Sequence, residues 1–123
     1  MAKRESLKMV LPIKPLSINQ AWQGRRFKTK EYKQFCQDVR LLIPGGTPRL
    51  TGFVEIKLIW YLKNWLRTDW DNPIKPLMDV LVSVGIIEDD RKILRGTVEK
   101  RPAKEDRIEI RIRKINRSEI IDS

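Results

Sequence analysis

The strongest strand pattern in this chain is Phe53-Val54-Glu55-Ile56-Lys57-Leu58-Ile59-Trp60-Tyr61-Leu62, in which successive side chains alternate between two faces. The first face is wholly apolar and comprises Val54, Ile56, Leu58, Trp60 and Leu62. The second face mixes charged residues with Ile59 and Tyr61 and is therefore half apolar. A strand that is apolar on both faces is typical of the middle of a sheet. We therefore expect this strand to be central.

Outward from this strand, the sequence predicts further strands and helices on both sides. They are a strand at 7–13, a helix from about 29 to 43, a helix from about 72 to 85, and strands at 92–101 and 107–113. The order is β-α-β-α-β-β, which predicts an α+β domain with a single mixed sheet and two helices packed on it. We expect one domain over residues 1–123, with its core at about 7–113 and a polar, frayed C-terminal tail.

Specific residues mark where these elements begin and end. Thr29 is a candidate N-cap for the first helix, and Pro44-Gly45-Gly46 stops it. Asn72 is a candidate cap for the second helix, which Gly85 closes. The last strand, 107–113, alternates apolar residues that point inward with charged residues that point outward.

The composition excludes several classes of enzyme. The chain of 123 residues contains no histidine, which excludes catalytic triads with histidine and histidine-ligated zinc sites. Its single cysteine, Cys36, excludes a disulfide framework. A net charge of +10 is typical of a protein that binds nucleic acid, although a merely basic protein shares it. Without a long apolar run or a signal peptide, we expect a cytoplasmic protein with no membrane partner.

An acidic segment follows the central strand in this basic chain. It reads Asp69-Trp70-Asp71-Asn72-Pro73-Ile74-Lys75, and Gly85-Ile86-Ile87-Glu88-Asp89-Asp90 comes after the next helix. Carboxylates without histidine or cysteine favour a hard cation such as Mg²⁺ or Mn²⁺. An acidic cluster in a basic protein therefore indicates a divalent metal held against a phosphate backbone.

The spacing predicts that three carboxylates meet. If the segment is extended, Asp69 and Asp71 point the same way, while Trp70 points into the core. The helix carries the chain about 18 Å away at 1.5 Å per residue. The extended return from Gly85 to Asp90 covers about 16 Å at ~3.3 Å per residue. We therefore expect Asp90 beside Asp69 and Asp71.

Such a site could hold one or two Mg²⁺ ions and hydrolyse a phosphodiester. Lys75, four residues after Asp71, can reach the carboxylates or a bound phosphate. The alternative is structural, because an aspartate at a helix start is favoured by the helix dipole. On that alternative the chain is a non-catalytic DNA- or RNA-binding module. The triplet Glu55-Ile56-Lys57 resembles part of a restriction-type nuclease motif, but its only near aspartate, Asp38, falls in the first helix.

The segment 16–28 is predicted to be a loop. It mixes aromatic residues with amides and basic residues, including Asn19, Arg25, Arg26 and Lys28, which suits contact with phosphates and bases. An ordinary solvated loop fits the same composition.

Several of these segments together resemble the RusA family of Holliday-junction resolvases from bacteria and lambdoid-type prophages. The resemblance covers about 7–113. It rests on Leu11-Pro12, Ser17-Ile18-Asn19, the segment 69–75, Asp79 and the segment 85–90.

The resemblance implies a Mg²⁺-dependent endodeoxyribonuclease, with Mn²⁺ as a substitute, that acts in DNA recombination and repair. It implies a homodimer that binds four-way junction DNA and nicks two strands symmetrically; a nuclease of this fold for other branched DNA is the near alternative. The catalytic residues it implies are Asp69, Asp71, Asp90 and Lys75, with Asp89 as a supporting residue or further metal ligand. A basic residue often precedes the first aspartate in this family, whereas here Thr68 does and Arg67, a candidate DNA contact, lies one position earlier.

Overall fold

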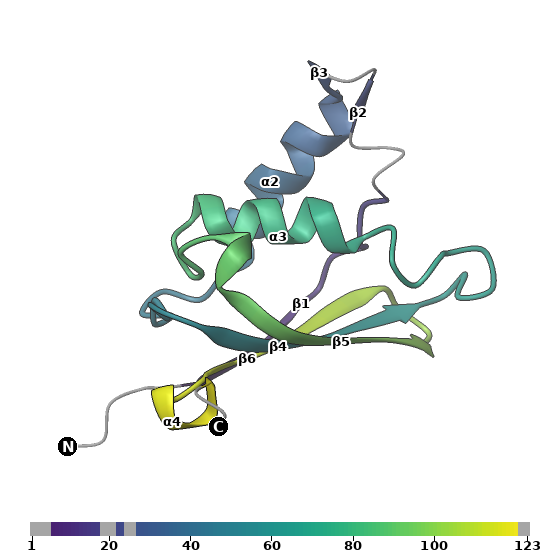
Figure 1. Ribbon diagram of the computed structural model, residues 1–123. Coiled ribbons are helices and arrows are strands. Elements are labelled where there is room, and N and C mark those ends of the chain that lie inside the picture. Colours follow the sequence, from purple (N-terminus) through teal and green to yellow (C-terminus); the bar gives the residue numbers. More distant parts are fainter. Residues whose placement is uncertain (1–5, 18–21, 24–26, 121–123) are drawn as a thin grey trace.

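The computed structural model describes residues 6–17, 22–23 and 27–120, and its elements confirm the predicted α+β class (Figure 1). In chain order they are β1 (Ser6–Leu11), β2 (Trp22–Gln23), β3 (Phe27–Lys28), α2 (Lys30–Leu42), β4 (Val54–Leu62), α3 (Ile74–Ser83), the 3-10 helix η1 (Asp90–Lys92), β5 (Ile93–Pro102), β6 (Arg107–Lys114) and α4 (Arg117–Ile120). No helix in these described parts is long and apolar enough to cross a membrane.

The main sheet is mixed and has four strands in the order β1-β6-β4-β5. β6 pairs antiparallel with both β1 and β4, whereas β4 and β5 are parallel. A parallel pair needs a crossover connection, and α3 supplies it. β4 is therefore internal, as its sequence predicted. Its apolar face, which comprises Val54, Ile56, Leu58, Trp60 and Leu62, is buried.

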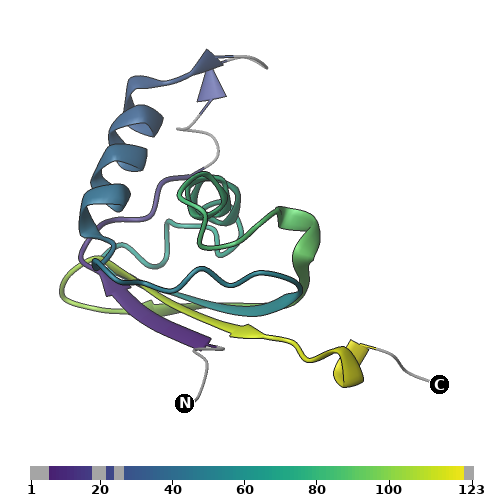
Figure 2. The ribbon, with the colours of Figure 1, turned by 90° about the vertical axis from the view of Figure 1, so that its left-hand side faces the viewer.

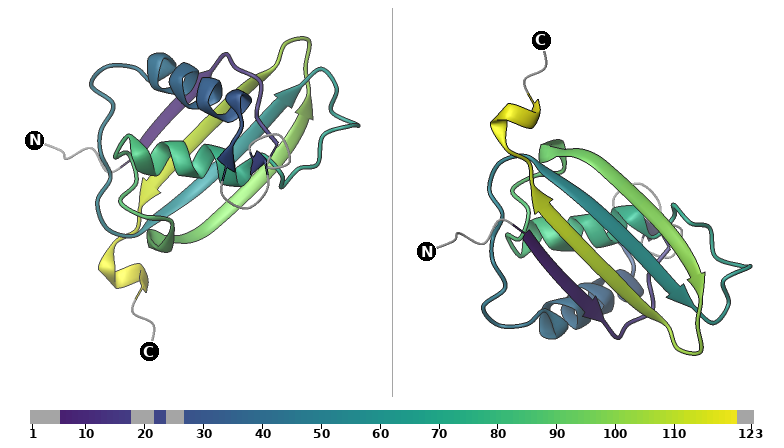
Figure 3. Two further views of the ribbon diagram at one scale, coloured as in Figure 1. Left: turned by 90° about the horizontal axis from the view of Figure 1, so that it is seen from above. Right: turned by 90° about the horizontal axis from the view of Figure 1, so that it is seen from below.

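α2 and α3 cover one face of this sheet, and the core lies between them and the strands (Figure 2). Trp60 of β4, Leu77 and Leu81 of α3 and Ile110 of β6 are fully buried there. Burying one large apolar side chain stabilises a fold by about 1.5–3 kcal/mol, so this layer holds α3 firmly. The opposite face of the sheet has neither helix against it (Figure 3, right).

Both helix ends that matter for the site have local causes. The side chain of Thr29 accepts a hydrogen bond from the Tyr32 N–H at 3.1 Å, which confirms Thr29 as the N-cap of α2. Asn72 was wrong as the cap of α3: the N-cap is Pro73, which makes no side-chain capping bond. The Asn72 amide instead bonds to Asp69.

The C-terminus of α3 ends as predicted at Gly85, whose φ is +83°. The Gly85 N–H bonds to the Val82 carbonyl at 3.0 Å, and the Ile86 N–H bonds to the Leu81 carbonyl at 3.1 Å. This pair of bonds is the Schellman arrangement, which satisfies the free carbonyls at a helix end. It turns the chain back toward the site.

Two expectations about the rest of the chain need correction. The predicted loop 16–28 contains a short antiparallel hairpin of β2 and β3. In the described part of the tail after Asn116, Arg117–Ile120 form the helical turn α4, in which Glu119 pairs with two arginines of the sheet. In β6 the charged residues face outward as predicted, and among them Glu109 is 6% exposed and accepts hydrogen bonds from Tyr61 and Arg111.

Candidate active site

The acidic segment 69–75 joins β4 to α3, and Asp90 opens η1 just before β5. Asp71, Lys75 and Asp90 line one cavity of about 470 Å³, together with Asn72, Ile74, Met78 and Ile93. Asp90 therefore returns beside Asp71, as the length of α3 predicts. The cavity lies between the first turn of α3 and the start of β5.

Lys75 bridges two carboxylates at this cavity. Its Nζ lies 3.0 Å from Asp90 Oδ2 and 3.1 Å from Asp79 Oδ1. These hydrogen bonds, first that to Asp90 and then that to Asp79, raise the pKa of Lys75, so the side chain is a cation throughout the neutral range. The expected i,i+4 contact with Asp71 is not among its ion pairs within the described residues, because α3 starts at Ile74 and Asp71 precedes the helix.

Asp79 and Tyr32 extend this bridge into the core, and sequence reasoning gave neither a role in the site. The Tyr32 hydroxyl donates to Asp79 Oδ2 at 3.0 Å, and Tyr32 itself is only 1% exposed. Burial, followed by the negative charge of Asp79, raises the pKa of Tyr32, so the hydroxyl stays protonated as a donor. A signal existed for Asp79, which lies four residues after Lys75 on the same helix. Nothing local indicates Tyr32, because its contact spans 47 residues.

The donor set at the cavity suits a hard cation. Asp90 Oδ2 is bonded to Lys75, but Asp90 Oδ1 is covered and has no hydrogen-bond partner among the described residues. A covered carboxylate oxygen without a donor is costly unless a cation or water satisfies it. Asp71, which is exposed, lines the same cavity. The two carboxylates therefore fit a divalent metal that takes oxygen ligands.

Asp69 does not join them. It lies outside this lining, and its Oδ2 accepts a hydrogen bond from the Asn72 amide at 2.8 Å. Within 6–17, 22–23 and 27–120, no three Asp, Glu, Cys or His side chains are close enough to hold one metal ion. The expected convergence of three carboxylates is thus met for two of them. Asp69 and Asp90 instead each accept a hydrogen bond from a nearby donor, Asn72 and Lys75.

Asp89 orients its neighbour. Its carboxylate caps η1 by accepting from the Arg91 N–H at 2.9 Å, and it forms an ion pair with the Arg91 guanidinium at 3.2 Å. The backbone hydrogen bond first, and the side-chain bond next, lower the pKa of Asp89. Asp89 thus fixes the turn that carries Asp90, and its oxygens are directed to Arg91.

Two hydrogen bonds from neighbouring strands hold the acidic loop. The indole N–H of the fully buried Trp60 donates to the Trp70 carbonyl at 2.7 Å, and Lys100 Nζ donates to the Thr68 carbonyl at 2.9 Å. The Trp70 side chain is 57% exposed, so its expected place in the core is wrong. The segment is a series of turns and bends, in which the alternation of an extended strand does not hold.

Most of the residues predicted to contact DNA lie outside the part of the chain that the structure describes. Asn19, Arg25 and Arg26 lie outside the described residues, and Lys28 is described only as a backbone position of β3. Arg67 is exposed in the loop between β4 and α3, the same loop that carries Asp71.

Comparison with known proteins agrees with this geometry. A model of the family described as Endodeoxyribonuclease RusA matches residues 12–113, which include every residue of the cavity. A search of curated proteins found no significant match. With most of its length matched, the chain belongs to the RusA family of endodeoxyribonucleases, the enzymes that resolve Holliday junctions.

Proposed function

We propose that this RusA-family endonuclease is Mg²⁺-dependent and resolves four-way junctions by paired symmetric nicks during recombination and repair. The observation that carries the proposal is the cavity at which Asp71, Lys75 and Asp90 meet, with Asp90 Oδ1 covered and unpartnered. On this proposal the enzyme acts in the cytoplasm on junction DNA.

Asp71 and Asp90 are the proposed ligands, and Asp69 joins them when it releases the Asn72 amide. When bound, the Mg²⁺ ion supplies an activated water and stabilises the departing oxyanion. Mn²⁺ prefers the same carboxylate oxygens and is expected to substitute. Asp89 supports the set by holding Asp90 in its turn.

Lys75 is the proposed electrostatic catalyst. Its protonated Nζ already lies at the cavity beside Asp90, where it can neutralise charge that develops on the scissile phosphate. Asp79, which accepts a hydrogen bond from Tyr32, positions it through a second ion pair. Around this centre, Asn19, Arg25, Arg26, Lys28 and Arg67 are proposed to bind the DNA backbone.

A homodimer is part of the proposal. A four-way junction has near two-fold symmetry, and a two-fold dimer presents two equivalent active sites to it. Each site would cut one of two symmetric strands, which accounts for paired nicks.

The test is cleavage of an end-labelled mobile four-way junction in Mg²⁺, beside a linear duplex of the same sequence. Asp71→Asn is expected to lower the rate by at least about a hundredfold, or roughly 2.7 kcal/mol of transition-state stabilisation. Junction binding should persist or tighten, because an anion near the phosphates is removed. Asp38→Asn, on α2 and outside the active-site cavity, is the matched control and should cut normally.

Two outcomes would count against this proposal. If Asp71→Asn loses binding and cleavage together, Asp71 has a structural role. If this protein cuts flaps or forks faster than four-way junctions, its preferred substrate is another branched DNA.

A further inference from the structure

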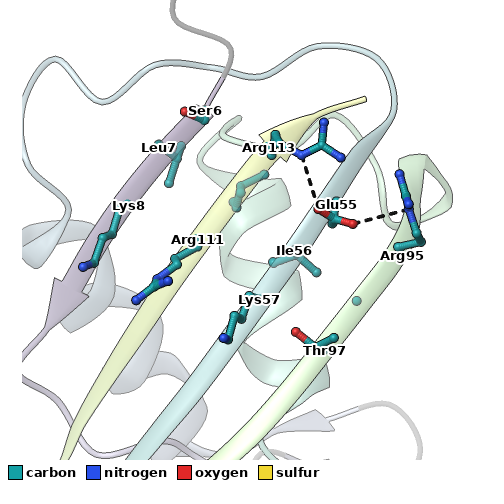
Figure 4. A pocket seen from close by; sticks show the side chains of 12 residues that line it. Ser6, Leu7, Lys8, Glu55, Ile56, Lys57, Arg95, Thr97, Arg111 and Arg113 are labelled. Carbon is teal, nitrogen blue, oxygen red and sulfur yellow. Dashed lines mark hydrogen bonds and ion pairs between the residues drawn. The ribbon is translucent and has the colours of Figure 1, made fainter. Parts of the chain in front are cut away.

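The open face of the sheet carries a second, larger cavity. It measures about 880 Å³, and the close view shows four strands contributing to it (Figure 4). Each strand supplies three consecutive residues, namely 6–8, 55–57, 95–97 and 111–113. The active-site cavity lies on the helix side of the sheet, so the two cavities are on opposite sides of the strands.

Strand register sorts the side chains of this face into rows that cross the sheet. In the first row Ser6, Arg113, Glu55 and Arg95 are neighbours, and two positions along each strand the second row places Lys8, Arg111, Lys57 and Thr97 side by side. We call Lys8, Arg111 and Lys57 the basic row. At about 4.8 Å between neighbouring strands, the basic row spans roughly 10 Å.

The first row is neutralised from within the chain. Glu55 lies between its two arginines, 3.3 Å from Arg113 and 3.4 Å from Arg95. Glu119 of α4 pairs with the same two arginines at 3.0 Å and 3.3 Å. Two carboxylates thus balance two guanidinium groups, and those of Glu119 and Glu55 raise the pKa of Arg113.

The basic row is not neutralised in this way. Arg111 pairs with Glu109 at 2.7 Å, but neither Lys8 nor Lys57 forms an ion pair within 4.0 Å with any described residue. Like charges directly opposite each other on neighbouring strands are destabilising. Because Arg111 is paired with Glu109, Lys8 and Lys57 carry the charge of the row that no ion pair among the described residues balances, and a bound polyanion would neutralise it.

We propose that this open sheet face is a second DNA-binding surface, on which the basic row follows the phosphate backbone of one junction arm. The proposal rests on the proposed function only in that DNA is the partner. Charge complementarity selects this occupant, because two copies of the chain placed face to face would oppose their basic rows. A four-way junction offers four duplex arms, so one arm can lie on this face while the scissile strand enters the active-site cavity.

The test measures DNA binding without divalent metal, so that it does not depend on cleavage. The double variant Lys8→Gln/Lys57→Gln and the native protein are titrated with a linear duplex and a four-way junction, between about 50 and 200 mM salt. Each phosphate contact contributes about −0.9 to the slope of log K against log salt. Losing two contacts should therefore make the slope of the double variant less steep by about 1.8. Binding should weaken equally for unrelated DNA sequences, since phosphates carry no base information.

The matched control is Lys30→Gln/Lys33→Gln, which removes two exposed cations from α2 and should keep the native slope. Glu119→Gln removes one of the two carboxylates that pair with Arg95 and Arg113 and leaves Glu55 with both, so it should tighten binding.

The Lys8→Gln/Lys57→Gln variant should unfold at no lower temperature than the native protein, because it relieves repulsion. This measurement separates loss of binding from loss of folding.

A folded double variant with the native slope would overturn the proposal, as would Glu119→Gln binding no tighter than native. If the double variant differs from the native protein in the mass of its assembly in solution but keeps the native slope, the face is an interface between protein subunits. That result would also overturn the proposal. The proposed function fails by a different result, namely the absence of Mg²⁺-dependent junction cleavage, and that result leaves the slope measurement decisive for this face.

Discussion

At the scale of single residues, the site depends on a relay that links the core to the cavity. Buried Tyr32 donates to Asp79, and Lys75 joins Asp79 at 3.1 Å to Asp90 at 3.0 Å. A lysine side chain has many rotamers, and ordering it costs entropy. Two carboxylate partners, one of them fixed by the core, hold the ammonium group at the cavity before DNA binds.

Tyr32→Phe tests this relay. The variant removes the hydroxyl that fixes Asp79, and a hydrogen bond of this kind contributes about 0.5–1.5 kcal/mol. We expect the junction cleavage rate to fall roughly two- to tenfold with junction affinity unchanged, because Tyr32 is buried away from DNA. Single-turnover kinetics and equilibrium binding give the two quantities.

Tyr61→Phe serves as control, since it removes a tyrosine hydroxyl that donates to Glu109 on the other side of the sheet. Its single-turnover rate should stay native. If Tyr32→Phe cuts at the native rate, Tyr32 has only a packing role.

At the scale of elements, the crossover β4–α3–β5 assembles the site. β4 anchors the acidic loop through Trp60, α3 carries Lys75 and Asp79, and the turn after α3 returns the chain to Asp90. The return depends on Gly85, whose φ of +83° lies in the left-handed region. A residue with a Cβ in that region is strained by about 1–2 kcal/mol.

Gly85→Ala should therefore lower the free energy of unfolding by about 1–2 kcal/mol. The added Cβ would lie 3.4 Å from the Arg49 guanidinium, a mobile group that can move, so the backbone strain dominates. Urea denaturation of the variant and the native protein measures the difference in their free energies of unfolding.

Gly45→Ala is the matched control. No atom lies within 4 Å of its added Cβ and its φ is not positive, so it should be neutral or slightly stabilising. Equal losses for both variants would contradict the role assigned to Gly85.

At the scale of the whole molecule, the sheet separates two charged regions. The helix side holds the cavity with Asp71 and Asp90, and the open side holds the basic row. A net charge of +10 draws DNA to the protein, while the local carboxylates keep a place for a cation. Metal binding at the acidic cavity should thus stabilise the entire fold by linkage.

Magnesium should raise the unfolding temperature of the native protein. A ligand at one hundred times its dissociation constant stabilises the folded state by about 2.7 kcal/mol. Asp71→Asn is expected to lose most of this shift, whereas Asp38→Asn should keep it. The unfolding temperature of each protein is measured in Mg²⁺ and in NaCl at equal ionic strength. If Mg²⁺ raises the unfolding temperature equally in the native protein, Asp71→Asn and Asp38→Asn, the ion binds elsewhere.

The sequence by itself determined the order of the four sheet strands and the two long helices, the central place of β4, the N-cap at Thr29 and the end of α3 at Gly85. These features depend on local rules: a period of two or 3.6, a capping hydroxyl, and a glycine where φ is positive. The distance from Gly85 to Asp90 also followed from the rise per residue, which is why Asp71 and Asp90 share a cavity as expected.

Only the tertiary structure decided which partners the charged side chains take. Lys75 pairs with Asp79 and Asp90 rather than Asp71, Tyr32 reaches Asp79 across 47 residues, and Trp70 stays exposed. The rows of the open face likewise depend on strand register. The physical reason is that such contacts are set by how helices pack on a sheet and how strands align, and both are settled by burial of the whole core rather than by any local pattern.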